Sequence, residues 1–333
     1  MRRWKRRKSG PVALAVFAAA AIIALAVGVV LPPVSQVEFG ATFSKPYAEE
    51  LGLDWRETYL AVLDDLGVRK LRIPAYWNEI EPVDGEYHFD DLDWQIDEAA
   101  KRGATVILSV GLRAPRWPEC YAPAWAGGLG QDELDRRVLT MIETVVRRYA
   151  AEPAIVAWQV ENEPFYRFGD CPRKIPVPVV ASEIALVHSL DGRPVLLQDI
   201  GEFSLWLRSA RMSDVLGVSM YRDVWNRYLG YVRWPGVAGW YRLRASLAHR
   251  YVGKVIITEM QAEPWTTTPV TEVPIDEQLR RMNPKELAAN IAFARRIGFP
   301  ETYVWGVEWW YWLKTKGHPE VWEEARKIFT LEP

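Results

Sequence analysis

The sequence is poor in the residues that build metal centres. Its 333 residues include two cysteines and four histidines, and the histidines are His88, His188, His249 and His318. They are scattered, without the spacing of a metal-ligand set. We therefore expect the histidines to be structural, and we predict neither a metal ion nor an organic cofactor.

Two further absences narrow the function. The chain has no internal repeat with a period of about 20 to 50 residues, which argues against a solenoid or a propeller. When the six basic residues of the opening MRRWKRRK are set aside, 35 of the 41 Lys and Arg remain against 43 Asp and Glu, a formal charge of −8. This acidic balance argues against a nucleic-acid partner. Tryptophan, by contrast, is abundant with 17 copies, which indicates either an aromatic core or an exposed cleft.

The N-terminus has the pattern of a membrane signal. A basic segment at 1–11 precedes an uncharged apolar run at 12–31, which is long enough to cross a bilayer, and 32–36 form a short linker. We predict a single-pass signal anchor in the cell membrane, with the domain at 37–333 outside the cytoplasm. Secretion after signal cleavage is the alternative, although the apolar run is longer than a signal peptide normally has.

From Val37 onward, short apolar or β-branched runs alternate with amphipathic helical patterns. The eight predicted strands lie at 37–43, 69–74, 105–111, 155–162, 194–199, 215–221, 254–259 and 302–308. This alternation is typical of βα units around a parallel sheet. It predicts an α/β fold, a (β/α)8 TIM barrel. We expect the long segment 222–251 to be a loop packed on the barrel rim, with a cleft wall or a membrane contact as alternatives.

The two cysteines fall in the loops after the third and fourth predicted strands. Cys120 lies in RWPEC and Cys171 lies in GDCP. The two loops are neighbours in such a barrel, and the predicted location is oxidising, so we predict a disulfide. Two unpaired thiols are the alternative.

Two glutamates stand where barrel chemistry is expected, at the carboxyl ends of strands. Glu163 follows the fourth strand in WQVENEPF, and Glu259 ends the seventh in VIITEMQAEPW. These strands lie across the barrel mouth from one another, so the two carboxyl groups can approach within several Å. Retaining glycosidases use such a pair, one as acid/base and one as nucleophile. Their mutual repulsion also keeps one of them protonated near neutral pH.

The motif Asn162-Glu163-Pro164 with the lone Glu259 resembles clan A of the glycoside hydrolases, the retaining (β/α)8 group that includes families 1, 5, 10, 39 and 42. The segment Leu71–Leu108 is similar to the second-strand region of clan members, with an arginine followed by Trp, IEP, Gly, an aromatic-x-Phe and Leu-Asp. Family 5 members usually carry a histidine after strand three and another before the strand-six tyrosine. Here those places read GLRAPRWPEC and SMYR, so we do not assign the chain to family 5.

The resemblance implies a role for each matching residue. Glu163 would be the acid/base and Glu259 the nucleophile. Arg72 and Tyr221 would hold the nucleophile, Asn162 would bind a substrate hydroxyl, and Trp309 at the end of strand eight would stack on the sugar. Further candidates for substrate contacts are Trp77, Arg113, Trp117 and Glu308. For Glu161, which precedes the motif, we expect a supporting role.

These observations predict a membrane-anchored retaining β-glycoside hydrolase that acts on extracellular or cell-envelope oligosaccharides or polysaccharides. The partners expected are the carbohydrate and, through the N-terminal helix, the membrane. A transglycosylase using the same glutamates and a non-catalytic glycan-binding barrel are the alternatives. The sugar, the linkage, endo or exo action and the oligomeric state have no readable code in the sequence.

Overall fold

The computed structural model of the chain describes residues 36–330, except 168, 172, 173, 202, 203, 227 and 235. The predicted basic segment and membrane anchor, residues 1–31, lie outside this part. Among the described residues, no helix combines the length and the apolar character that a membrane span requires.

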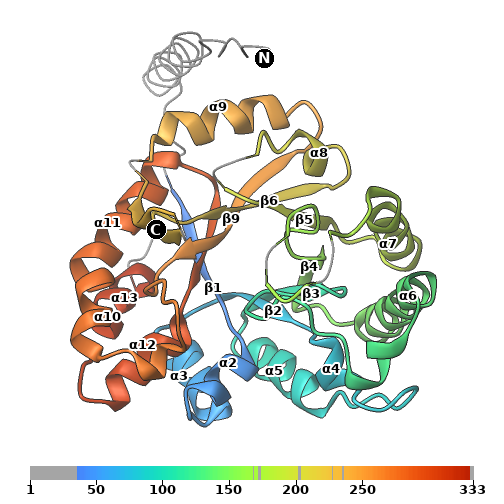
Figure 1. The fold of residues 1–333 in the computed structure, drawn as a ribbon, viewed down its shortest axis with the longest axis horizontal. Helices are drawn as coiled ribbons and strands as arrows, with labels where there is room; N and C mark the ends of the chain where they lie inside the picture. Colours follow the sequence, from blue (N-terminus) through green and yellow to red (C-terminus); the bar gives the residue numbers. More distant parts are fainter. Residues whose placement is uncertain are drawn as a thin grey trace, which may run out of the picture.

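Eight parallel strands close into a barrel, as the sequence predicts (Figure 1). Neighbouring strands follow the order β1-β10-β9-β6-β5-β4-β3-β2. Their bounds are β1 (Glu38–Thr42), β2 (Lys70–Pro74), β3 (Thr105–Val110), β4 (Ile155–Val160), β5 (Val195–Asp199), β6 (Val215–Met220), β9 (Lys254–Gln261) and β10 (Glu301–Trp305). The barrel brings the carboxyl ends of β4 and β9 to the same face, which positions the two candidate glutamates.

The helices surround the barrel (Figure 1). They are α2 (Lys45–Glu50), α3 (Trp55–Asp64), α4 (Trp77–Ile80), α5 (Asp90–Lys101), α6 (Gln131–Tyr149), α7 (Val177–Leu190), α8 (Leu207–Ala210), α9 (Ala238–Ala248), α10 (Ile275–Arg281), α11 (Pro284–Ile297), α12 (Val307–Thr315) and α13 (Glu320–Thr330). In α5 three aspartates occupy the first turn and Lys101 the last, which suits the helix dipole. In α11 the side chain of Asn283 caps the first turn and Gly298, at φ 73°, ends the helix.

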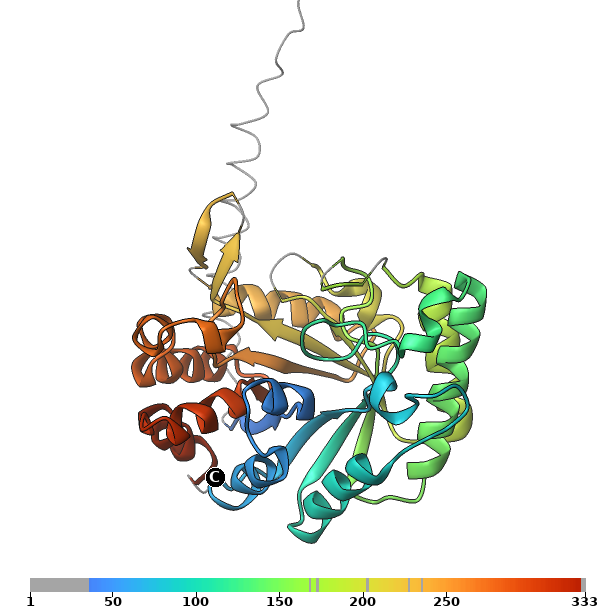
Figure 2. The ribbon, with the colours of Figure 1, turned by 60° about the horizontal axis from the view of Figure 1, so that its bottom comes forward.

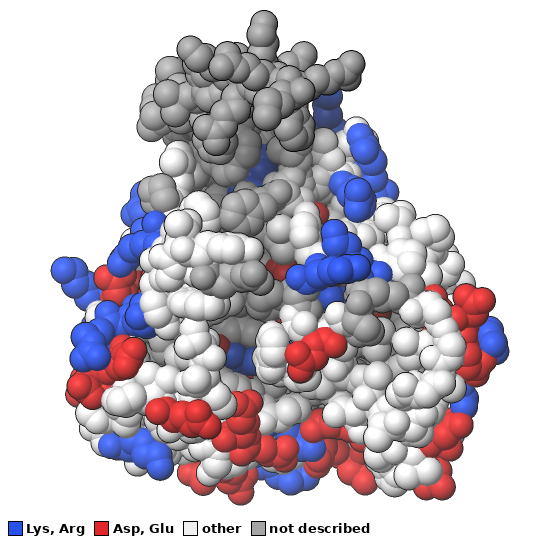
Figure 3. All heavy atoms as spheres, in the orientation of Figure 1, with Lys and Arg blue, Asp and Glu red and all other residues white. Residues whose placement is uncertain are grey.

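Charged side chains gather along the lower edge of the face seen in Figure 3. Ion pairs also join three of the outer helices. Lys45 of α2 and Arg56 of α3 both contact Asp91 of α5, at 2.9 and 2.5 Å. Because these pairs are partly exposed, each contributes little stability.

Two segments differ from the sequence prediction. Residues 222–251, expected as a rim loop, contain an antiparallel hairpin of β7 (Asp223–Asn226) and β8 (Gly230–Arg233), followed by α9. Figure 2 shows the hairpin projecting from the barrel. The last strand ends at Trp305 rather than at residue 308, because Gly306 has φ 122° and α12 begins directly after it.

Candidate active site

Arg72 lies at the centre of a buried hydrogen-bond network inside the barrel. It comes from β2 and is fully buried. Its Nε donates to Oε1 of Gln159 at 2.7 Å, and Nη2 donates to Oδ1 of Asn162 at 2.8 Å and to Gln198. Nη1 donates to Oε1 of Glu259 at 3.0 Å. The planar guanidinium has five N–H donors, so one side chain fixes polar groups from β4, β5 and β9 together.

Glu259, on β9, is held at both carboxylate oxygens. Oε1 accepts from Arg72, and Oε2 accepts from the Tyr221 hydroxyl at 3.1 Å. These are the contacts that the clan resemblance implies for Arg72 and Tyr221. The side chain of Glu259 is almost fully buried, with 4% of the residue exposed. Burial, followed by the charge of Glu259, raises the pKa of Tyr221 well above its ordinary value, so the phenol stays a hydrogen-bond donor.

Glu163, the second carboxyl group, follows β4 with a backbone φ of 45° and is half-buried. The hydroxyl of Ser219, on β6, donates to its Oε1. Burial raises the pKa of Glu163 well above its ordinary value, and the negative charges of Glu259 and Glu119 raise it further. A carboxyl group in these surroundings is suited to carry a proton near neutral pH.

Glu161 supports the backbone, as expected from the sequence. Its two oxygens accept the backbone N–H groups of Leu112 and Arg113, each at 2.7 Å. Burial raises the pKa of Glu161 to about 7, although the two backbone hydrogen bonds lower it. A Cβ at Gly111 would come within 2.5 Å of Oε1 of Glu161. The end of β3 therefore needs a glycine to admit this carboxylate.

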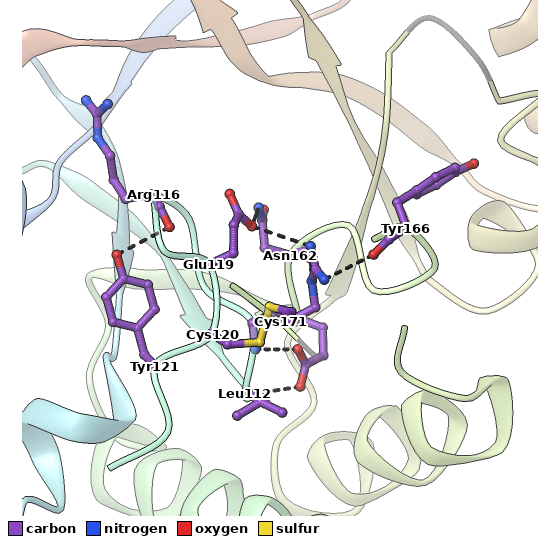
Figure 4. The surroundings of a disulfide bond; sticks show 10 residues. Leu112, Arg116, Glu119, Cys120, Tyr121, Asn162, Tyr166 and Cys171 are labelled. Atoms are coloured by element: carbon purple, nitrogen blue, oxygen red, sulfur yellow. Dashed lines mark hydrogen bonds and ion pairs between the residues drawn. A yellow bond between two sulfur atoms is a disulfide. The ribbon is translucent and has the colours of Figure 1, made fainter. Parts of the chain in front are cut away.

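Glu119 is a third carboxyl group in the site, and it is not among the residues predicted from the sequence. It follows β3 at φ 75°, and its Oε2 accepts from Nδ2 of Asn162 at 3.0 Å. Burial and then the charge of Glu259 raise the pKa of Glu119 to about 8. Figure 4 shows Glu119 turned toward Asn162, next to the predicted disulfide of Cys120 and Cys171, which is present. The sequence feature that could have marked Glu119 is its position directly before Cys120, a predicted disulfide cysteine.

Arg113 and Arg116, both in the loop after β3, are also buried. Arg113 donates from Nε to the backbone oxygen of Asn162 at 2.8 Å and from Nη1 to that of Tyr166 at 3.1 Å. These bonds fix the turn that carries Glu163. Arg113, predicted to touch substrate, therefore acts on the chain that presents the acid/base candidate.

Arg116 is the centre of a second buried group, the Arg116 cluster, and it is not among the residues predicted from the sequence. Its guanidinium is ion-paired with both Glu263 and Glu308, at 3.0 Å from Glu308, and lies 3.7 and 4.3 Å from the ring centroids of Tyr47 and Trp305. Glu263 also accepts from the indole N–H of Trp305 at 2.9 Å. Two carboxylates and two aromatic faces thus enclose one cation.

The structure corrects three predicted substrate contacts. Trp309 is fully buried in α12, where its indole donates to Oε1 of Gln278 at 2.6 Å. Trp77 is fully buried in α4, and its indole donates to Oε2 of Glu81 at 2.6 Å. Glu308 is fully buried and bound by Arg116 and the backbone N–H of Ser44.

The remaining aromatic candidates lie elsewhere. Trp117 is 61% exposed at the tip of the loop after β3 and can still meet a ligand. The tryptophan at the end of the last strand is Trp305. Within the described residues, no group of three or more His, Cys, Asp or Glu is arranged to hold a metal ion.

Comparison with known proteins points to carbohydrate enzymes. A beta-galactosidase family model, that of glycoside hydrolase family 42, matches residues 53–126. The chain is 22% identical over 120 residues to beta-galactosidase BgaA of Clostridium cellulovorans, covering 31% of this chain and 18% of that protein. It is 29% identical over 128 residues to a probable mannan endo-1,4-beta-mannosidase F of Emericella nidulans, covering 35% of this chain and 28% of that protein. The match thus spans less than a third of either relative.

The fold has close counterparts among solved structures. A family 5 subfamily 18 glycoside hydrolase from Streptomyces cattleya, solved in complex with GlcNAc, superposes with a TM-score of 0.58 at 15% identity, covering 91% of this chain and 82% of the other. At this identity the likeness establishes the barrel fold alone. The matched family segment, the curated relatives and the neighbouring folds all fit glycoside hydrolase clan A.

Proposed function

We propose that this chain is a retaining β-glycoside hydrolase, with Glu163 as the acid/base and Glu259 as the nucleophile. The observation that carries the proposal is the contrast between their surroundings. Glu259 accepts hydrogen bonds at both oxygens from Arg72 and Tyr221, which fix the position of the attacking group. Burial and two neighbouring negative charges raise the pKa of Glu163, which favours its protonated form.

In the first step a carboxylate oxygen of Glu259 attacks the anomeric carbon and forms an ester bond to the sugar. The glycosidic C–O bond breaks, and Glu163 gives its proton to the departing oxygen. Arg72 and Tyr221 hold the attacking carboxylate in position throughout.

In the second step Glu163 acts as a base. It takes a proton from water, the water oxygen bonds to the anomeric carbon, and the ester bond to Glu259 breaks. The sugar leaves with its original anomeric configuration because the carbon has been inverted twice. Both glutamates return to their starting protonation states.

We also propose that the protein acts outside the cytoplasm on extracellular or cell-envelope glycans. The disulfide between Cys120 and Cys171 supports this location, because disulfides persist in oxidising compartments. The predicted anchor at 12–31 supports attachment to the membrane. β1 begins at Glu38, on the barrel end opposite the carboxyl groups, so an anchor joined there would leave the site facing away from the bilayer. Protease digestion of intact cells tests the location of the domain. Protease added outside the cells should cleave within residues 37–333 only.

The activity is tested with the full chain in detergent and a panel of aryl β-glycosides of glucose, galactose, mannose, xylose and arabinofuranose. We expect one or more to be hydrolysed, and Glu259→Ala to abolish turnover. Azide should restore turnover of Glu259→Ala and give a sugar azide of inverted configuration. The matched control is Glu143→Ala, which removes an exposed carboxylate that pairs with Arg147 on α6. If wild type hydrolysed none of the substrates, and if Glu259→Ala bound glycan as tightly as wild type, the protein would instead be a binding protein.

A further inference from the structure

The loop at 112–121, here called the β3 loop, reaches across the barrel mouth. Near its tip, the carbonyl of Pro115 accepts from the hydroxyl of Tyr76, a residue that follows β2, at 2.9 Å. The next residue, Arg116, lies over the ring of Tyr47, in the helix that follows β1. The tip of a loop that starts from β3 is therefore seated over the loops of the two preceding strands.

The same tip continues to the far side of β1. Arg116 pairs with Glu263, which follows β9, and with Glu308, which follows β10. The base of the loop is held to the segment after β4 by the disulfide from Cys120. The β3 loop is thus fixed at its base and at its tip. The tip lies over the carboxyl ends of β9, β10, β1 and β2, here called the sector of these strands.

This sector lies on a defined side of the reaction. An acid/base must face the departing oxygen, so the leaving group lies on the side of Glu163. Glu163 follows β4 and accepts from Ser219 on β6, which places it over the β4–β6 sector. The sugar that becomes bonded to Glu259 extends the other way, toward the tip of the β3 loop.

The Arg116 cluster is built to stay closed. Arg116 is 6% exposed and Glu308 is fully buried. Separating a buried ion pair leaves an uncompensated charge, which carries a large free-energy cost. Two aromatic rings also cover the guanidinium. A sugar chain cannot displace this group without that cost, so the cluster forms a wall.

We propose that the Arg116 cluster closes the glycone side of the site, so that the protein removes terminal sugars from the non-reducing end of its substrate. This specificity rests on the proposed hydrolase activity. Arg116 is the specificity-determining residue because it joins the loop tip to both Glu263 and Glu308. The substrate class is then a β-linked glycan with a free non-reducing end.

The test compares two aryl substrates of the sugar that the panel identifies. One is the aryl β-monoside, and the other is an aryl β-bioside, 1,3- or 1,4-linked, whose terminal sugar carries a 4-O-benzyl ether. We expect wild type to release the aryl group from the blocked bioside at least about a hundredfold more slowly, because the wall excludes the second sugar. Equal or faster release from the bioside overturns the proposal while leaving the hydrolase activity intact. Turnover of no substrate at all is a failure of the proposed function.

Variants test whether Arg116 forms the wall that excludes the second sugar. We expect Arg116→Ala to raise the bioside-to-monoside rate ratio by about tenfold or more, since removing the guanidinium opens the sector. Arg102→Ala is the matched control, because Arg102 also pairs with a carboxylate, Asp64, but on the outer helices. An unchanged ratio in a folded Arg116→Ala protein overturns the role of Arg116. If that variant does not fold, the wild-type comparison still decides whether the glycone side is closed.

Discussion

The carboxyl ends of β4 and β10 show how one barrel uses similar residues in opposite ways. After β4 the chain passes through Glu161 and Glu163 with positive φ and presents polar side chains to the site. After β10 it turns once at Gly306 and enters α12, so that Glu308 and Trp309 are fully buried. The path of the backbone just beyond the strand, rather than the residue type, decides whether a side chain joins the candidate site or packs in the core.

The largest expected effect separates the two glutamates after β4. Glu163→Gln should lower kcat/KM by about 10²–10⁴-fold by removing the proton donor, with little change in thermal unfolding. Glu161→Gln should instead lower the melting temperature, because the amide nitrogen that replaces one carboxylate oxygen cannot accept the backbone N–H of Leu112 or Arg113 that faces it. Rate assays and thermal denaturation of both variants measure this. If Glu163→Gln and Glu161→Gln lost activity equally and were equally stable, the two glutamates would not have different roles.

Loss of the disulfide is expected to have the next largest effect. It should lower the free energy of unfolding rather than the activity. Cys120 and Cys171 are 51 residues apart, and closing a loop of that length stabilises by about 4 kcal/mol in the chain-entropy estimate. The double variant Cys120→Ser with Cys171→Ser should therefore unfold at a lower denaturant midpoint. Wild type treated with reductant provides the comparison. A midpoint that does not move contradicts the expected tether between the loops after β3 and β4.

The β10 side is tested by Trp309→Phe. Losing the indole N–H leaves Oε1 of Gln278 unsatisfied in a buried place, which should cost about 1–3 kcal/mol of stability. KM should not change, because the ring does not reach the site. Trp117→Phe, at an exposed position, is the control for stability. A raised KM in Trp309→Phe at unchanged stability would restore the stacking role that the sequence predicts.

The smallest expected effect concerns pH. Glu119 ionises as pH rises through about 8, and its charge helps to raise the pKa of Glu163. Activity is lost on the alkaline side when Glu163 gives up its proton. Glu119→Gln removes the neighbouring charge, so Glu163 should deprotonate sooner and the alkaline limb of kcat/KM should move to lower pH, by about one unit or less. A limb that moves to higher pH has the wrong sign for this mechanism.

The sequence predicts the barrel and its two glutamates for a physical reason. Each strand is a short buried run, and Glu163 and Glu259 end such runs, so position along the chain indicates position in space. The disulfide is predictable in the same way, because successive loops of a barrel are neighbours.

The same reasoning fails where contacts are distant or the boundary is unclear. Arg116 pairs with Glu263, which is 147 residues away, so no local pattern marks it. At the end of β10 the aromatic run continues across Gly306 without a change of period, and the strand is predicted three residues too long. That error assigns the tryptophan at the end of the strand to Trp309, whereas the strand ends at Trp305.

Backbone conformation also limits how this site can vary among related sequences. Of the non-glycine residues with positive φ in the described part of the chain, Arg116, Glu119, Glu161 and Glu163 belong to the site and Trp206 does not. Such conformations cost about 1–3 kcal/mol each and persist where surrounding contacts enforce them. β-Branched residues should be rejected at these four positions in a mutational scan. Glycine should relax the backbone but remove the side chain, so that selection for fold stability and selection for activity oppose each other there.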